Sequence, residues 1–210
     1  LRYRADRKFP PDHLQATAFR FVSTNVPIDS QYAAYAREAF LPGRPLVEAA
    51  DALMRMIHRD FKFDASATET FTPVEQAFKA RRGVCQDFSH IMIACLRSVG
   101  LAARYMSGYI LTHPPEGKER LVGADATHAW VAVFVPDFGW LELDPTNALR
   151  ADREHITLGW GRDFSDITPM RGVLLGGGDH EPEIAVTVVP EEEFASLYAD
   201  GETYLEELSP

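Results

Sequence analysis

The clearest hydrophobic pattern in the chain predicts a helix that begins near Cys85. Beyond Phe88, apolar residues recur three, four, seven, eight and eleven positions later, at Ile91, Met92, Cys95, Leu96 and Val99. This spacing places them on one face of an amphipathic helix. Gly100 follows at the position where a glycine commonly ends a helix. Extended backwards, the pattern places Cys85 on the same face, in the first turn.

Start and stop signals predict three more helices upstream. Asp29 and Ser30 can cap a short helix, whose apolar positions are Tyr32, Tyr35, Ala36 and Phe40. Pro45 is placed to begin a longer helix that runs to about Arg59. Thr72-Pro73-Val74-Glu75 has the form of a capping box with proline at the first helical position, and this third helix should end near Ala80. Before these helices, short strands are expected near Ala18–Val22.

After the cysteine helix, the pattern changes to that of β-strands. Ala103–Leu111 is expected to be a strand with a weak point or bulge at Gly108. The polar stretch Thr112–Thr127 is a loop long enough to have a function, for example as a lid. β-branched and aromatic residues then predict an antiparallel hairpin, with strands His128–Val135 and Trp140–Asp144 joined by a turn. Two further strands are expected at Gly172–Leu175 and Ile184–Val189.

The register of the hairpin decides whether His128 and Asp144 can meet. If Val135 stood opposite Trp140, the two side chains would face opposite sides of the sheet, because side chains alternate along a strand. If Phe134 stands opposite Trp140, they share a face. We predict the second register.

Composition and charge narrow the range of functions. The chain has 210 residues, of which 46% are hydrophobic and 25% charged, as is typical of a soluble globular domain. The net charge is −10, and the ten acidic residues beyond Arg171 account for it because no Lys or Arg follows. An acidic balance argues against nucleic-acid binding, and no apolar run is long enough to span a membrane. The sequence leaves the oligomeric state open.

The two cysteines are expected to be free thiols. Cys85 and Cys95 would lie roughly 15 Å apart along one helix, which is too far for a disulfide. Free thiols fit a reducing compartment, so a cytoplasmic location is expected. Cys95 falls in the middle of the apolar face and is interpreted as a core residue. Cys85 is placed at the positive end of the helix dipole, which favours the thiolate and therefore a nucleophile.

A cysteine nucleophile needs a base, and the base needs an orienting partner. His128 and Asp144 provide both residue types from the open end of one hairpin, 43 and 59 residues after Cys85. The alternative for a single cysteine is a small core residue without chemistry. The combination with His128 and Asp144 favours a Cys-His-Asp triad, with the backbone N–H of Cys85 as one oxyanion donor. The sequence does not identify a second donor.

Three motifs carry a family resemblance. They are Gly83-Val84-Cys85-Gln86-Asp87-Phe88, Thr127-His128-Ala129-Trp130 and Leu143-Asp144-Pro145-Thr146-Asn147. In this order they resemble transglutaminase-like proteins, especially the bacterial branch described as candidate cysteine proteases. The resemblance covers about residues 45 to 175. It implies an α+β, papain-like fold, with the nucleophile helix packed on an antiparallel sheet, and it assigns Cys85, His128 and Asp144 as the triad.

The expected function is acyl transfer from an amide bond of a peptide or protein. Hydrolysis of a peptide or isopeptide bond is the first hypothesis, and transamidation, in which an amine replaces water, is the second. A non-catalytic domain that binds peptides in the same groove is the third. The triad chemistry is common to the first two, so the sequence does not separate them.

Two neighbours of the triad are expected to have supporting roles. Asp87 should cap the cysteine helix or pair with Arg81 or Arg82, and Trp130 should pack beside His128 and shield it from water. No cofactor is expected. A metal site is not expected either, because the histidines lack the spacing of common zinc motifs.

The domain boundaries follow from these elements. Residues 1–28 are expected to be a partial N-terminal segment of β type or a linker, 29–190 the catalytic domain, and 191–210 an acidic tail. Members of the bacterial branch often carry a longer N-terminal β-rich segment. Because the chain begins with Leu1, a leader or an upstream domain is expected to have preceded it.

Overall fold

A computed structural model describes residues 11–68, 72–113, 125–168, 172, 176 and 185–194. Its centre is a sheet with the strand order β6-β5-β4-β3-β7, in which every neighbouring pair is antiparallel. The strands are β3 (Ala103–Ile110), β4 (His128–Val135), β5 (Gly139–Asp144), β6 (Leu149–Arg150) and β7 (His155–Gly161). The α+β class and the packing of the cysteine helix on an antiparallel sheet are therefore confirmed.

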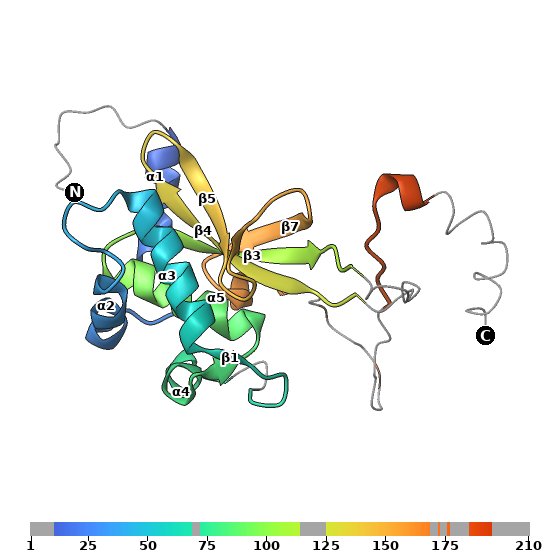
Figure 1. Ribbon diagram of the computed structural model, residues 1–210, viewed down its shortest axis with the longest axis horizontal. Coiled ribbons are helices and arrows are strands. Elements are labelled where there is room, and N and C mark those ends of the chain that lie inside the picture. Colours follow the sequence, from blue (N-terminus) through green and yellow to red (C-terminus); the bar gives the residue numbers. More distant parts are fainter. Residues whose placement is uncertain are drawn as a thin grey trace.

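Helices gather beside this sheet, and most of them lie to the left of it in Figure 1. The α-helices of the core are α1 (Pro11–Thr17), α2 (Ser30–Arg37), α3 (Leu46–Asp60), α4 (Val74–Ala80) and α5 (Cys85–Ser98). Two 3₁₀-helices, η1 (Ala18–Arg20) and η2 (Phe164–Asp166), and a small parallel pair, β1 (Lys62–Phe63) with β2 (Arg82–Gly83), complete these elements. The predicted helices upstream of Cys85 are all present.

Helix α5 is the centre of the hydrophobic core. It is buried on nearly all sides between Asp87 and Arg97 because it packs against β4 and β3 on one side and against α2 on the other. Side chains from one face of β4, namely Ala129, Val131 and Val133, join its apolar residues in the core. The predicted ends of the helix are confirmed: Gly100 follows with φ +86°, a value that glycine adopts without strain. Burial of the whole helix fixes the position of its first residue, Cys85.

The hairpin has the predicted register. Phe134 stands opposite Trp140, and Val131 stands opposite Leu143. His128 and Asp144 therefore lie on the same face of the sheet, since both are an even number of positions from this pair. The predicted irregularity in β3 is also present, because the pairing of β3 with β7 shifts between Ser107 and Gly108.

The expectation of strands near Ala18–Val22 was wrong. Residues Ala18–Arg20 form η1 instead. The physical reason is a buried arginine: the guanidinium of Arg97 donates hydrogen bonds to the carbonyl oxygens of Phe19 and Phe21, at 2.9 and 3.0 Å. These carbonyls are satisfied by a side chain rather than by a neighbouring strand.

Two further differences concern element boundaries. Helix α4 begins at Val74, with Pro73 as the N-cap, one residue later than predicted. Strand β7 was not predicted. Its residues Ile156, Leu158 and Trp160 alternate with Thr157 and Gly159, but all three are exposed, so this alternation does not mark a face buried in the core.

Several predictions fall wholly or mainly outside the described residues. They concern most of the Thr112–Thr127 loop, most of the expected strand at 172–175, the first ten residues, and most of the acidic tail from 191 to 210. The strand expected at Ile184–Val189 was wrong: its described residues, 185–189, form no strand beyond a bridge at Val186. The reason is that Asp125 bonds this segment, since its backbone N–H donates to the carbonyl of Val186 and its carboxylate accepts from the N–H of Val188. Among the helices that the structure describes, none has the length and apolar character needed to cross a membrane.

Candidate active site

Cys85 is the first residue of α5 and is half-buried. The preceding residue, Val84, has an extended backbone and is the N-cap, so the helix begins at the cysteine. The first backbone N–H groups of a helix have no partner within it, and together with the helix dipole they create a positive potential at this end. The thiol is therefore placed where negative charge is stabilised.

Asp87 caps this helix, as the sequence predicted. Its Oδ2 accepts hydrogen bonds from the backbone N–H of Val84, at 2.8 Å, and from the hydroxyl of Thr68, at 2.7 Å. Burial raises the pKa of Asp87, against the effect of these two hydrogen bonds. The carboxylate fixes the backbone directly before Cys85, so its role is structural and acts on the position of the thiol.

Gly83→Ala tests how far this cap matters. A Cβ at Gly83 would lie 2.5 Å from Oδ2 of Asp87, so the carboxylate would have to move and release Val84. We expect a loss of about 1–3 kcal/mol in the free energy of unfolding and slower reaction of Cys85 with alkylating agents. Gly172→Ala is the matched control, because a Cβ there meets nothing within 4 Å. Equal stability of the two variants in chemical denaturation would contradict the capping role.

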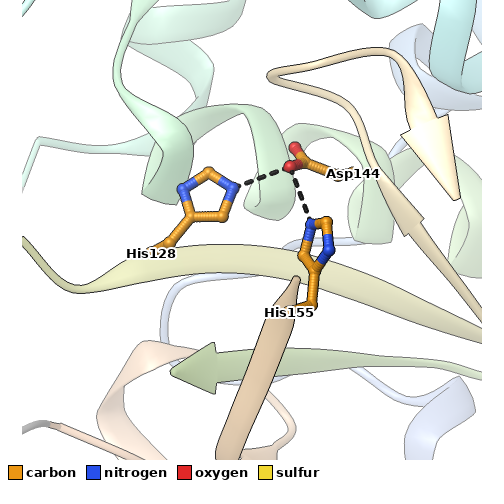
Figure 2. Close-up of side chains that lie close together, drawn as sticks. All are labelled: His128, Asp144 and His155. Carbon is orange, nitrogen blue, oxygen red and sulfur yellow. Dashed lines mark hydrogen bonds and ion pairs between the residues drawn. The ribbon is translucent and has the colours of Figure 1, made fainter. Parts of the chain in front are cut away.

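His128 and Asp144 meet at the open end of the hairpin (Figure 2). His128 is the first residue of β4 and Asp144 the last of β5. Nε2 of His128 lies 2.8 Å from Oδ2 of Asp144, and both side chains are buried. Because an ionised carboxylate only accepts hydrogen bonds, Nε2 of His128 carries the proton of this bond. Nδ1 is then the ring nitrogen left for another partner, and Cys85 is among the groups that raise the pKa of His128.

The carboxylate of Asp144 is held from several directions. Its Oδ1 accepts from the backbone N–H groups of Thr146 and Asn147, at 2.8 and 3.2 Å. Its Oδ2 accepts from the side-chain amide of Asn147 at 2.7 Å, in addition to His128. Burial by itself would raise the pKa of Asp144, but the hydrogen bonds outweigh it and hold that pKa well below its usual range. Asp144 is therefore a fixed negative charge at neutral pH.

This charge acts on His128. Burial lowers the pKa of His128, but the hydrogen bonds to Asp144 and Cys85 outweigh burial and raise it from 6.5 to about 9. An imidazolium is thus stabilised between a carboxylate and a thiol.

Residues 17–145, which are more than half of the chain, match the family model described as the transglutaminase-like superfamily. The chain belongs to the transglutaminase-like superfamily. The Cys85, His128 and Asp144 motifs quoted above all lie in or at the end of the matched region.

The chain is also similar to individual proteins. An uncharacterized protein of Mycobacterium tuberculosis is 47% identical over 161 residues, which are 74% of this chain and 51% of that protein. A protein-glutamine gamma-glutamyltransferase of Pseudomonas aeruginosa is 32% identical over 113 residues, which are 52% of this chain and 17% of the enzyme.

A solved structure shows the same fold. It is described as a candidate cysteine protease from Cytophaga hutchinsonii, and it has 22% identity and a TM-score of 0.62 over 77% of this chain and 50% of that one. This transglutaminase-like chain therefore spans about half the length of the mycobacterial relative and of the solved neighbour.

Trp130 lies beside the histidine in this transglutaminase-like site. Its ring is fully buried and stacks on His128, with ring centroids 6.0 Å apart and planes 23° apart. The indole N–H donates to Glu142 at 2.8 Å, so its donor is engaged. Trp130 therefore packs against the histidine, and its shielding of the site from water stays a prediction.

The sequence interpretation missed a second histidine. His155, the first residue of β7, has its Nε2 3.3 Å from Oδ2 of Asp144, and its side chain is 2% exposed. The β-branched and aromatic residues of 156–160 were a signal for a strand here, but Gly159 among them and Gly161 after them weakened it. Figure 2 shows both histidines directed at the same carboxylate oxygen.

These three side chains contain metal-ligand types. One ring nitrogen of each histidine and an oxygen of Asp144 all lie within 4.8 Å of one another, and two imidazoles with a carboxylate can bind a transition metal. Here, however, each imidazole nitrogen is directed at the same oxygen at hydrogen-bond distance. A metal ion would have to displace both protons. The geometry fits a hydrogen-bond network centred on Asp144 better than a metal centre.

The raised pKa of His128 predicts an alkaline limit for a reaction that needs the imidazolium. Because the folded-state pKa of about 9 lies above the ordinary value of 6.5, the proton is retained at neutral pH and lost as the pH rises through about 9. We expect kcat/KM to fall with an apparent pKa near 9. The same shift stabilises the fold fully below about pH 6.5, and this stabilisation is lost between about 6.5 and 9. A limb near 6.5 in the pH profile would contradict this description of the site.

Proposed function

We propose that this chain catalyses acyl transfer from amide bonds of peptides or proteins, with Cys85 as the nucleophile, His128 as the general acid and base, and Asp144 as the residue that orients His128. The observation that carries the proposal is the arrangement of the His128 ring. Its Nε2 is committed to Asp144 at 2.8 Å, which leaves Nδ1 for the thiol of Cys85, and its pKa is raised to about 9.

The reaction begins with attack of the Cys85 thiolate on the carbonyl carbon of the amide. The backbone N–H of Cys85, at the N-terminus of α5, is placed to donate to the oxyanion that forms. The His128 imidazolium gives its Nδ1 proton to the amide nitrogen, the C–N bond breaks, and the amine leaves. The acyl group is then held as a thioester on Cys85.

The second half of the reaction resolves the thioester. His128, now neutral, accepts a proton at Nδ1 from the incoming acceptor, which attacks the thioester carbonyl. The C–S bond breaks, and the thiolate and imidazolium are restored. With water as acceptor the product is a carboxylic acid, and with a primary amine it is a new amide. Throughout both halves, the Nε2–H group of His128 donates to Asp144. This hydrogen bond keeps the proton on Nε2 and leaves Nδ1 to exchange protons in the reaction.

Hydrolysis is the function that we favour, because water reaches a half-buried thiol without a binding site, whereas transamidation requires a bound amine and the exclusion of water. Transamidation is the second candidate. It is favoured by one specific observation, the 32% identity over 113 residues to the protein-glutamine gamma-glutamyltransferase of Pseudomonas aeruginosa. The two candidates share the thioester and differ only in the acceptor.

One experiment tests the proposal and separates its two forms. The wild type and Cys85→Ala are incubated with a peptide library in H₂¹⁸O, with and without a biotinylated alkyl amine, and the products are identified by mass spectrometry. Hydrolysis incorporates ¹⁸O into a new carboxylate, and transamidation attaches the amine. Binding of library peptides by both variants, with neither product from the wild type, would contradict the enzyme proposal and support a peptide-binding domain.

A further inference from the structure

Asp144 is shared by two histidines, and the reaction proposed above uses only one of them. We propose that His155 is a positioning residue, which holds the carboxylate of Asp144 in the orientation that keeps His128 in its reactive tautomer. This inference rests on the proposed function. It assigns a role to a residue that never touches the substrate and acts only through Asp144.

The hydrogen bond requires a proton on Nε2 of His155. An ionised carboxylate accepts hydrogen bonds and cannot donate them, so the contact at 3.3 Å with Oδ2 of Asp144 is made by an Nε2–H group. On the other side of the ring, the backbone N–H of Asp152 donates to Nδ1 at 3.4 Å. Its carboxylate oxygen lies 3.5 Å from the same nitrogen. In the neutral form the backbone contact favours Nε2–H, and in the charged form both nitrogens are protonated.

The His155 ring is held in place by burial and by its packing against Trp130. The side chain of His155 is 2% exposed and that of Asp144 is fully buried. The His155 ring meets the Trp130 ring edge to face, with centroids 5.2 Å apart and planes 74° apart. Trp130 in turn stacks on His128. Both ends of the hydrogen-bond network are thus packed against one indole, and the position of His155 is set by the same residue that packs the proposed base.

The two oxygens of Asp144 are held by different means. Oδ1 is fixed by two backbone N–H groups of the following turn. Oδ2 accepts from His128, and among the described residues its other donors are the side chains of Asn147 and His155. Without His155, Asn147 is the one described donor besides His128 that limits rotation of the carboxylate on this side. The ring of His128 is then held less firmly, and proton transfer to and from Cys85 becomes slower.

Two substitutions separate the hydrogen bond from the packing. His155→Phe keeps an aromatic ring against Trp130 and removes the donor, whereas His155→Gln can place an amide N–H near the position of Nε2. We expect His155→Phe to lower kcat, and the rate of Cys85 alkylation by iodoacetamide at pH 6, by roughly tenfold, with KM nearly unchanged. We expect His155→Gln to recover most of this loss. Circular dichroism and thermal unfolding check that both variants are folded.

The outcomes distinguish this inference from the proposed function. If wild-type Cys85 reacts no faster than glutathione at pH 6, the proposed function fails. If the wild type reacts fast and folded His155→Phe reacts equally fast, only the role of His155 fails. An equal loss in the Phe and Gln variants would also overturn it, because the donor would then be irrelevant.

Two measurements that need no substrate complete the test. Long-range ¹H–¹⁵N NMR of the histidine rings at pH 7 should show a proton on Nε2 of His155, and a neutral ring protonated on Nδ1 would overturn the assignment. Metal analysis of the purified protein should show no stoichiometric zinc. One equivalent of zinc in the wild type, lost in His155→Phe, would show that the two histidines and Asp144 hold a metal instead.

Discussion

Replacing Cys85 by alanine is expected to lower turnover of an amide substrate by a factor on the order of 10⁶, as losses of a nucleophile do in hydrolases that act through a triad. The thiol is half-buried at the start of α5 and contributes little to the core. Stability should therefore stay within about 1 kcal/mol of the wild type. Comparing kcat/KM and the midpoint of unfolding for both proteins tests both expectations.

Cys95→Ala is the matched control. Cys95 lies on the same helix, and burial raises the pKa of its thiol well above the usual range, so it stays protonated and unreactive. We expect this variant to keep its activity and to lose about 1 kcal/mol of stability through the small cavity it creates. The proposal would be contradicted if Cys95→Ala were inactive while Cys85→Ala retained turnover.

Asp144→Asn is expected to lower kcat by a factor on the order of 10⁴, the loss measured when the orienting aspartate of a serine protease triad is replaced by asparagine. An amide can donate as well as accept, so it can hold the His128 ring in the wrong tautomer. The negative charge that raises the pKa of His128 is also lost. The alkaline limb near pH 9 should therefore move to lower pH in the residual activity.

A second buried aspartate provides the control for this variant. Asp163 is 1% exposed, and hydrogen bonds from Asn25 and Ser165 lower its pKa to about 2 despite burial, which by itself would raise it. Because a lowered pKa stabilises the folded state above the ordinary value, Asp163→Asn should cost stability at neutral pH. It should leave the pH profile of activity unchanged. A shift of the limb in Asp163→Asn as large as that in Asp144→Asn would show that the effect is not local to the site.

The parts of the site that the sequence predicted depend on strong local patterns. The apolar face of residues 88–99 determines where α5 begins, and therefore where Cys85 lies. The register of the hairpin follows from requiring His128 and Asp144 on one face, and the pairing of Phe134 with Trp140 confirms it. These are consequences of helical and strand periodicity, which a single sequence displays.

The parts that the sequence did not predict depend on contacts between distant segments. Strand β7 is an exposed edge strand that pairs with β3 across some 50 residues of chain, so no local pattern shows that the two strands are neighbours. His155 was therefore not connected with Asp144. In the same way, no local pattern in residues 18–22 shows that the Arg97 side chain donates hydrogen bonds to the carbonyl oxygens of Phe19 and Phe21.

The central claim is that Cys85 and His128 form a reactive thiolate and imidazolium pair. The most direct measurement is the rate of Cys85 alkylation by iodoacetamide at pH 6, in the wild type and in His128→Gln, with glutathione as the reference thiol. Our account predicts that wild-type Cys85 reacts at least about tenfold faster than glutathione and that His128→Gln loses this advantage. Equal rates for the wild type, His128→Gln and glutathione would contradict it.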